Sequence, residues 1–118
     1  APHFEWFSHA LESKETILYV ADICGLAIGQ VRFTLLNSKW WLDYSIDVDF
    51  RGKGFAKQIV HQALSKLTLD MPQASVGALV KAQNGASRHV LEWCGFIEQV
   101  PQVKLEDVLE FEWRGFGE

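Results

Sequence analysis

The chain has 118 residues, a hydrophobic fraction of 48% and a formal net charge of −4, which describe a globular chain long enough for one domain with a single core. The acidic balance argues against a nucleic-acid partner, and the lack of a long apolar run argues against a membrane-spanning segment. The 2 cysteines form no disulfide framework and the 4 histidines are scattered, so we expect one domain over residues 1–118, without a metal site, in a reducing cytoplasm.

The first part of the chain predicts a helix followed by a hairpin. Aromatic and aliphatic residues recur at helical spacing near the start and predict a short helix over residues 3–13. Residues 17–23 and 26–36 are rich in β-formers and are separated by a cysteine-glycine pair, a pattern typical of a hairpin. Gly29, inside the second of these strands, indicates a bulge or close packing.

Residues 39–48 predict a half-buried strand because their apolar and polar side chains alternate. Tyr44 and Ile46 belong to the apolar face of this strand, and Asp43 and Asp47 belong to the polar face. A short glycine-rich loop follows at once. We therefore expect the polar end of this strand to lie beside the loop.

The second half of the chain continues as helix, strand and helix. A stripe of apolar residues predicts a helix from about 53 to 69, and a short apolar strand follows at residues 75–80. Asn84 is a good N-cap for a helix over residues 85–94, which Gly95 ends. Two closing strands complete the expected order α-β-β-β-α-β-α-β-β.

The loop before the helix at 53–69 has the features of an anion site. A strand ends, glycines follow and a helix begins, so free backbone N–H groups and the positive end of the helix dipole meet at one point. Arg51, Lys53 and Lys57 add positive charge with no acid among them, although the chain is acidic overall. The loop lacks the Gly-Lys-Ser/Thr of a Walker motif and the three spaced glycines of a dinucleotide fingerprint. It predicts a site for a phosphorylated small ligand.

Two motifs in this chain resemble those of the GCN5-related N-acetyltransferase (GNAT) family. Arg51-x-x-Gly54-x-Ala56 matches the family's Arg/Gln-x-x-Gly-x-Gly/Ala signature, and the stretch from Asn84 to Phe96 resembles its second motif. The resemblance implies an α/β (α+β) fold with a mixed, mostly antiparallel sheet whose fourth and fifth strands splay apart around the cosubstrate acetyl-CoA. The family usually begins with a further strand and helix, so the resemblance also implies an N-terminally shortened member.

The family pattern implies which residues of this chain hold the cosubstrate. Backbone amides of the loop would bind the diphosphate, and the backbone at Ile46 and Val48 would bind the pantetheine arm. Lys53, Lys57 or Arg88 would meet the 3′-phosphate. The implied cosubstrate-binding residues are Ile46, Val48, Arg51, Gly52, Lys53, Gly54, Phe55, Ala56, Lys57, Asn84 and Ser87.

The implied reaction is direct attack of an amine on the thioester, with no nucleophilic side chain. With a pKa of about 10, only on the order of one amine in a thousand is neutral at pH 7, so a base or a desolvating pocket must help. Asp47 and Asp43 are candidate bases and could also attract a cationic amine. Many family members protonate the leaving thiolate with a tyrosine where this chain has Leu91, and Ser87, Tyr44 or a water could take that role. The predicted catalytic residues are Asp47, Ser87 and Tyr44.

The acceptor is expected to be a primary amine, either on an amino sugar or at a protein N-terminus. The spacing after Asn84 resembles ribosomal-protein N-terminal acetyltransferases and amino-sugar acetyltransferases, and residues 3–7 resemble nucleotide-amino-sugar enzymes of bacterial surface-glycan synthesis. Two alternatives stay open: a non-catalytic CoA-binding module, and a fragment that takes a missing strand from a partner chain. Trp40 and Trp41 lie on opposite faces of one strand, so we expect one in the core and the other either lining the acceptor pocket or forming a contact in a homodimer.

Overall fold

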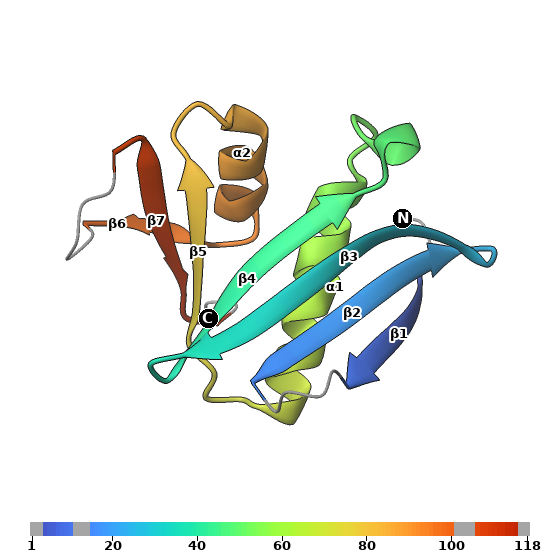
Figure 1. The fold of residues 1–118 in the computed structure, drawn as a ribbon, viewed down its shortest axis with the longest axis horizontal. Coiled ribbons are helices and arrows are strands. Elements are labelled where there is room, and N and C mark those ends of the chain that lie inside the picture. Colours follow the sequence, from blue (N-terminus) through green and yellow to red (C-terminus); the bar gives the residue numbers. More distant parts are fainter. Residues whose placement is uncertain (1–3, 11–14, 101–105, 116–118) are drawn as a thin grey trace.

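A computed structural model describes residues 4–10, 15–100 and 106–115 of the chain, with the backbone alone at residues 7–10 (Figure 1). The described part forms seven strands, two α-helices and one 3₁₀ turn. In chain order these are β1 (Glu5–Ala10), β2 (Thr16–Ile23), β3 (Leu26–Leu36), β4 (Lys39–Ile46), η1 (Val48–Phe50), α1 (Phe55–Asp70), β5 (Val76–Lys81), α2 (Gly85–Trp93), β6 (Ile97–Gln99) and β7 (Val108–Trp113).

All seven strands belong to one mixed sheet in the order β1-β2-β3-β4-β5-β7-β6. The pair β4–β5 is parallel, and the other neighbouring strands pair in the antiparallel direction. A parallel pair needs a crossover connection, which α1 provides between β4 and β5. The sheet confirms the predicted α/β class and the predicted hairpin of β2 and β3.

β4 and β5 pair only at their beginnings and then separate. Their ladder consists of Trp40 opposite Val76 and Trp41 opposite Gly77. Gly77 permits this approach, since a Cβ atom there would lie 2.8 Å from the Trp41 ring. Farther along, β4 stays paired with β3 and β5 stays paired with β7, and Figure 1 shows the two strands diverging toward the end of the sheet where α2 lies. The predicted splay of the fourth and fifth strands is confirmed.

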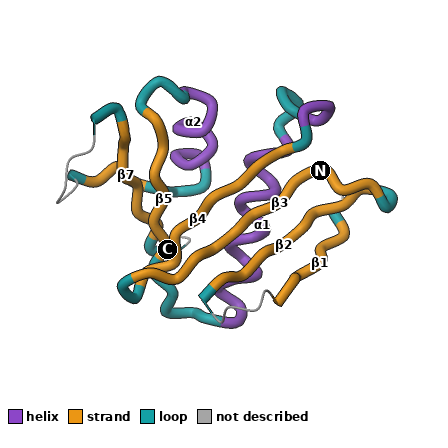
Figure 2. The backbone as a smooth tube through the Cα atoms, viewed as in Figure 1, coloured by secondary structure: helices purple, strands orange, loops and turns teal. Residues whose placement is uncertain are grey.

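α1 covers the sheet with the apolar stripe that the sequence predicted. Its fully buried side chains are Ile59, Val60, Ala63, Leu64 and Leu67. The helix packs on β3 and β4 and also contacts α2. Figure 2 shows the connection from β4 through η1 to α1 at the same end of the sheet as α2. The loop and the start of both helices therefore meet where β4 and β5 separate.

The close packing expected at Gly29 is present at the end of β4. A Cβ atom on Gly29 would lie 2.9 Å from Ile46 Cδ1 and 3.0 Å from the Ser45 carbonyl oxygen. The β2–β3 register also shifts between Ala21 and Asp22, opposite this part of β3. The absence of a side chain at Gly29 thus lets β3 and β4 approach closely next to the loop.

The helix expected over residues 3–13 is wrong for the part that the structure describes, because residues 5–10 form the edge strand β1, paired with β2. Residues 3 and 11–13 lie outside the described residues. Phe4 is buried and Trp6 is half-buried, and a period of two places both toward α1, where Trp6 Nε1 donates to Gln62 Oε1 at 2.8 Å. Strand pairing therefore outweighed a local helical pattern, and β1 supplies a further strand at the sheet edge.

Candidate active site

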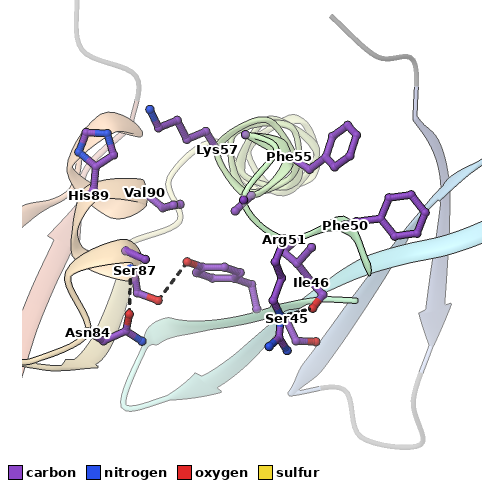
Figure 3. Close-up of a pocket in the computed structure, with 15 residues that line it drawn as sticks. Ser45, Ile46, Phe50, Arg51, Phe55, Lys57, Asn84, Ser87, His89 and Val90 are labelled. Carbon is purple, nitrogen blue, oxygen red and sulfur yellow. Dashed lines mark hydrogen bonds between the residues drawn. The ribbon is translucent and has the colours of Figure 1, made fainter. Parts of the chain in front are cut away.

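A cavity of about 540 Å³ lies where β4 and β5 separate. The end of β4 and the following loop form one wall, the first turn of α1 forms another, and the start of α2 forms the third (Figure 3). The lining residues are Tyr44, Ser45, Ile46, Phe50, Arg51, Gly52, Gly54, Phe55, Ala56, Lys57, Asn84, Ala86, Ser87, His89 and Val90.

The loop that precedes α1 presents bare backbone to this cavity. Gly52 and Gly54 have φ angles of 75° and 79°, in the left-handed region that favours glycine. Gly54 is the N-cap of α1 and provides no side-chain cap. A Cβ atom on either glycine would meet nothing within 4 Å, so the space beside both is open. The first N–H groups of α1 and the positive end of its dipole can therefore bind an anion in the cavity.

Three hydrogen bonds fix the loop, one to β4, one to β3 and one within η1. Arg51 Nε donates to the carbonyl oxygen of Ile46 at 3.0 Å. Asp47 caps η1, because its Oδ1 accepts from the Asp49 N–H at 3.0 Å, and the Asp47 N–H donates to the Ile28 carbonyl at 2.8 Å. Asp47 thus positions the backbone of the loop and does not line the cavity, whereas Arg51 both holds the loop through Ile46 and lines the cavity.

The opposite wall is the N-terminus of α2, which Asn84 caps. Asn84 Oδ1 accepts from the Ser87 N–H at 3.1 Å. This contact uses only the amide oxygen, so the Asn84 side-chain nitrogen can still donate to a ligand. The capping role that the sequence predicted is confirmed, and both residues line the cavity.

A hydrogen bond joins the two walls across the split in the sheet. The Tyr44 phenol from β4 and the Ser87 hydroxyl from α2 lie 3.1 Å apart. In Figure 3 a dashed line from the labelled Ser87 to an unlabelled phenol ring marks this contact. Burial raises the pKa of Tyr44 above its usual value of 10.0, while the hydrogen bond to Ser87 lowers it and the nearby Cys94 and Asp43 raise it. Tyr44 is therefore a protonated phenol at neutral pH.

Leu91 follows Ser87 by one helical turn and is 1% exposed. The Tyr44 hydroxyl approaches the same face of α2 from the facing strand. A phenol from β4 thus lies near the helix face on which Leu91 replaces the tyrosine implied by the family pattern.

A second opening, of about 400 Å³, lies on the other side of this bridge. It shares Tyr44, Asn84 and Ser87 with the larger cavity. The side chains of Asp43 on β4 and Lys81 on β5 are exposed at this opening. The two spaces meet at the Tyr44–Ser87 pair, so molecules that enter from different sides could meet there.

The structure brings together most of the residues that the sequence singled out. The predicted residues that line the larger cavity are Tyr44, Ile46, Arg51, Gly52, Gly54, Phe55, Ala56, Lys57, Asn84 and Ser87. Three others do not line it. Asp47 caps η1, Val48 is 68% exposed within η1, and Lys53 Nζ lies over the Phe50 ring at 5.8 Å from its centre. Of the three basic residues considered for a phosphate, Lys57 lines the cavity.

Sequence reasoning missed five lining residues: Ser45, Phe50, Ala86, His89 and Val90. Three of them lie on α2, where the spacing from Ala86 to His89 and Val90 follows one helical face. That periodicity could have been extended from Asn84 and Ser87 in the sequence. Phe50 lies in η1, whose place over the cavity depends on the path of the loop.

Neither cysteine has the environment of a nucleophile. Cys94 is buried, and desolvation raises the pKa of its thiol to about 11 although Lys57 lowers it. Its Sγ donates to the Lys57 carbonyl oxygen at 3.7 Å. Cys24 is exposed in the turn between β2 and β3, away from the cavity residues. In the part of the chain that the structure describes, no three His, Cys, Asp or Glu side chains cluster as metal ligands.

Comparison with known protein families assigns the fold and the chemistry. Residues 3–97 match the family model described as the acetyltransferase (GNAT) domain. The chain belongs to the GNAT family. It is therefore an acetyl-CoA-dependent N-acetyltransferase, which moves an acetyl group to an amine.

Solved structures of spermidine N-acetyltransferase from Vibrio cholerae share this fold. A complex with CoA and spermine has a TM-score of 0.78 at 21% identity, covering 87% of this chain and 68% of that chain. A dodecameric structure in an intermediate state has a TM-score of 0.75 at 20% identity, covering 86% of this chain and 66% of that one. Comparison with curated protein sequences found no match. Among the described residues, no helix has both the length and the apolarity that crossing a membrane requires.

Proposed function

We propose that this GNAT protein acetylates a small primary amine that enters through the second opening and meets the thioester at the Tyr44–Ser87 pair. The single observation that supports this is the 3.1 Å contact between those two hydroxyl groups, where the two spaces join. The amine nitrogen forms the new bond to the acetyl carbon, the carbon–sulfur bond breaks, and the amine gives up a proton. Tyr44 supplies a proton to the departing sulfur, and the proton that the nitrogen loses returns through water to the Tyr44 phenolate.

In the proposed cosubstrate site, different walls of the larger cavity bind different parts of acetyl-CoA. The backbone N–H groups from Gly52 to Ala56 bind the diphosphate, supported by the bare loop and the uncapped start of α1. The backbone from Tyr44 to Ile46 and the Asn84 amide bind the pantetheine arm from its two sides. Lys57, whose side chain lines the cavity, supplies positive charge to a phosphate of the cosubstrate. Arg51 holds the loop in place through the Ile46 carbonyl.

Asp43 is a better candidate than Asp47 for the carboxylate that meets the amine. Asp43 lines the second opening, and its charge acts on the Tyr44 phenol. Asp47 instead caps η1 through its carboxylate. An ammonium drawn to Asp43 can pass its proton to that carboxylate or to a water beside it as it enters the drier cavity, which makes the neutral amine available for attack.

The charges at the second opening favour an acceptor that is not a pure polycation. Asp43 attracts an ammonium group, and Lys81 across the opening repels a second positive charge but attracts a phosphate or a carboxylate. A nucleotide-linked amino sugar carries both groups, and a protein N-terminus carries one amine beside polar peptide groups. The V. cholerae enzyme that shares the fold binds spermine, a polyamine that lacks any anionic group.

A direct test measures release of the free thiol from acetyl-CoA with a panel of amines at one concentration. The panel contains a nucleotide-linked amino sugar, the matching free amino sugar, a peptide with a free N-terminus, spermidine and a blocked peptide as control. We expect the highest kcat/KM with the nucleotide-linked amino sugar. Higher kcat/KM with spermidine than with any acceptor that carries an anionic group would contradict the proposed acceptor class.

The alternative of a CoA-binding module without catalysis rests on the buried Leu91, where the family's usual proton donor is absent. Membership of the acetyltransferase (GNAT) family favours catalysis instead. Thiol release above the uncatalysed rate with any amine of the panel distinguishes an enzyme from such a module. A separate proposal concerns assembly: we propose that the chain forms a homodimer. Measurement of its mass in solution tests this, and a monomeric mass would contradict it.

A further inference from the structure

A band of four side chains continues from the mouth of the cavity along the contact between α1 and α2. Lys57 and His61 are one turn apart on α1, and His89 and Trp93 are one turn apart on α2. Lys57 Nζ lies 5.6 Å from the centre of the Trp93 ring, and the His61 and Trp93 ring centres are 6.1 Å apart at 64°. Figure 3 shows Lys57 extending from α1 toward the part of α2 that carries His89.

Lys57 connects two hollows on this side of the molecule. Its side chain lines the anion cavity together with His89, and its ammonium lies over Trp93. Trp93 and His61 in turn line a separate open hollow of about 750 Å³ beside β6 and β7. The path from the diphosphate site across Lys57 thus leads directly to the Trp93 ring.

Trp93 is 54% exposed, although most large aromatic side chains of the described residues are buried. The Trp93 ring contacts Lys57 and His61 of α1 and still leaves more than half of its surface to solvent, which suits stacking against a planar ring. The electron-rich face that now attracts the Lys57 ammonium could equally stack on a purine. A phosphate at the mouth would draw the ammonium of Lys57 from the ring toward itself.

We propose that Trp93 is the stacking platform for the purine ring of the cosubstrate, with Lys57 binding a phosphate between that ring and the loop of Gly52 and Gly54. This inference rests on the proposed acetyl-CoA site, because the position of the diphosphate fixes where the adenosine begins. The adenosine leaves the cavity between Lys57 and His89 and lies along α2. The platform contributes to affinity for the nucleotide end of the cosubstrate and makes no contact with the reacting thioester.

The test compares CoA with 4′-phosphopantetheine, which lacks the adenosine, in binding to the whole chain by calorimetry. Trp93→Ala should weaken CoA binding roughly 5- to 100-fold, the range expected for loss of one base–aromatic stack, and leave phosphopantetheine binding unchanged. Trp93→Phe should retain most of the CoA affinity because it keeps a stacking ring. Leu69→Ala, which truncates an exposed apolar side chain elsewhere on α1, is the control and should change neither affinity.

A second readout uses fluorescence, with adenosine 3′,5′-bisphosphate as the probe. The bisphosphate should quench part of the tryptophan emission in the parent protein and in Leu69→Ala, and should quench much less of it in Trp93→Phe. Equal weakening of CoA and phosphopantetheine in Trp93→Ala, or no weakening of either, would overturn the platform while leaving acetyl transfer intact. Failure of the parent protein to bind either ligand would instead refute the proposed cosubstrate site itself.

Discussion

The Tyr44 phenol on β4 and the Ser87 hydroxyl on α2 lie 3.1 Å apart and bridge the two halves of the sheet where they separate. The bridge joins a strand that the core holds through Leu42 and Ile46 to a helix that Asn84 caps. Ser87 thereby orients the phenol toward the point where both openings meet. A phenol held on β4 can therefore take the place of the proton donor that the helix lacks at Leu91.

Tyr44→Phe should lower kcat by roughly ten- to a hundredfold and leave the Kd for CoA nearly unchanged, because it removes a proton donor but keeps the ring. The measurement is thiol release at saturating acetyl-CoA, together with calorimetry of CoA. Ser87→Ala should have a smaller effect on kcat, since the phenol remains and loses only the group that orients it. An unchanged kcat in Tyr44→Phe would exclude the phenol as the donor.

The pH dependence follows from the raised pKa of Tyr44. Because the folded-state pKa lies above 10.0, the phenol keeps its proton through the neutral and mildly alkaline range, and donor activity falls only at pH values above 10. Below pH 10 we expect kcat of the parent and of Tyr44→Phe to vary with pH in the same way. An alkaline decline centred near pH 8 in the parent, and absent from Tyr44→Phe, would contradict the raised pKa of Tyr44.

Comparison of Asp43→Asn with Asp47→Asn shows which of the two carboxylates acts on the amine substrate and which only supports the loop. Each variant removes one negative charge, but only Asp43 lines the second opening, while an asparagine at 47 can still cap η1. Asp43→Asn should raise KM for the amine or lower kcat/KM by about tenfold, and Asp47→Asn should change it less than twofold. Initial rates over a range of amine concentrations measure both. A larger loss in Asp47→Asn would return the role of base to Asp47.

Gly29→Ala should destabilise the fold by about 1–3 kcal/mol, because the new Cβ would press on Ile46 Cδ1 and the Ser45 carbonyl. The free energy of unfolding in urea measures the loss. Gly85→Ala is the matched control, since a Cβ there meets nothing within 4 Å at the first residue of α2, where alanine favours the helix. Equal stabilities of the two variants would mean that β3 and β4 are not in close contact at Gly29.

Thiol labelling tests whether the cysteines are available for chemistry. Cys24 is exposed, whereas Cys94 is buried with a thiol pKa of about 11. At pH 8 the folded protein should react at Cys24 quickly and at Cys94 only after unfolding. Labelled Cys24 should leave acetyl transfer unchanged. Rapid modification of Cys94 in the folded protein would show that the contact between α1 and α2 opens readily.

Much of the fold could be predicted because local pattern and tertiary packing agree. The apolar stripe that the sequence predicts on α1, from Ile59 to Leu67, is buried in the structure. Asn84 caps the start of α2, as its side-chain chemistry predicts. The segment at residues 5–10 could not be predicted from periodicity. Its aromatic residues satisfy a helical and a strand spacing equally, and pairing with β2 decides between them.

The anion site was accessible from sequence because glycine spacing and a helix start define it locally, and Gly52 and Gly54 both line the cavity. Two features depend on contacts between distant segments and were not accessible. The Asp47 carboxylate caps a 3₁₀ turn and is therefore not directed to the reaction. Tyr44 contacts Ser87 only once β4 and α2 are packed together. Neither arrangement has a signal within one segment.

The most direct test of the central account is calorimetric titration of CoA into Gly54→Glu and Gly25→Glu. Both glycines have a φ of +79° and open space beside them, so the two variants carry the same backbone strain and the same added charge. Gly25 lies in the turn between β2 and β3, and Gly54 caps α1 beside the cavity. Gly54→Glu should abolish CoA binding while Gly25→Glu binds as the parent does. Unchanged CoA affinity in a folded Gly54→Glu protein would contradict the claim that the main chain before α1 holds the diphosphate.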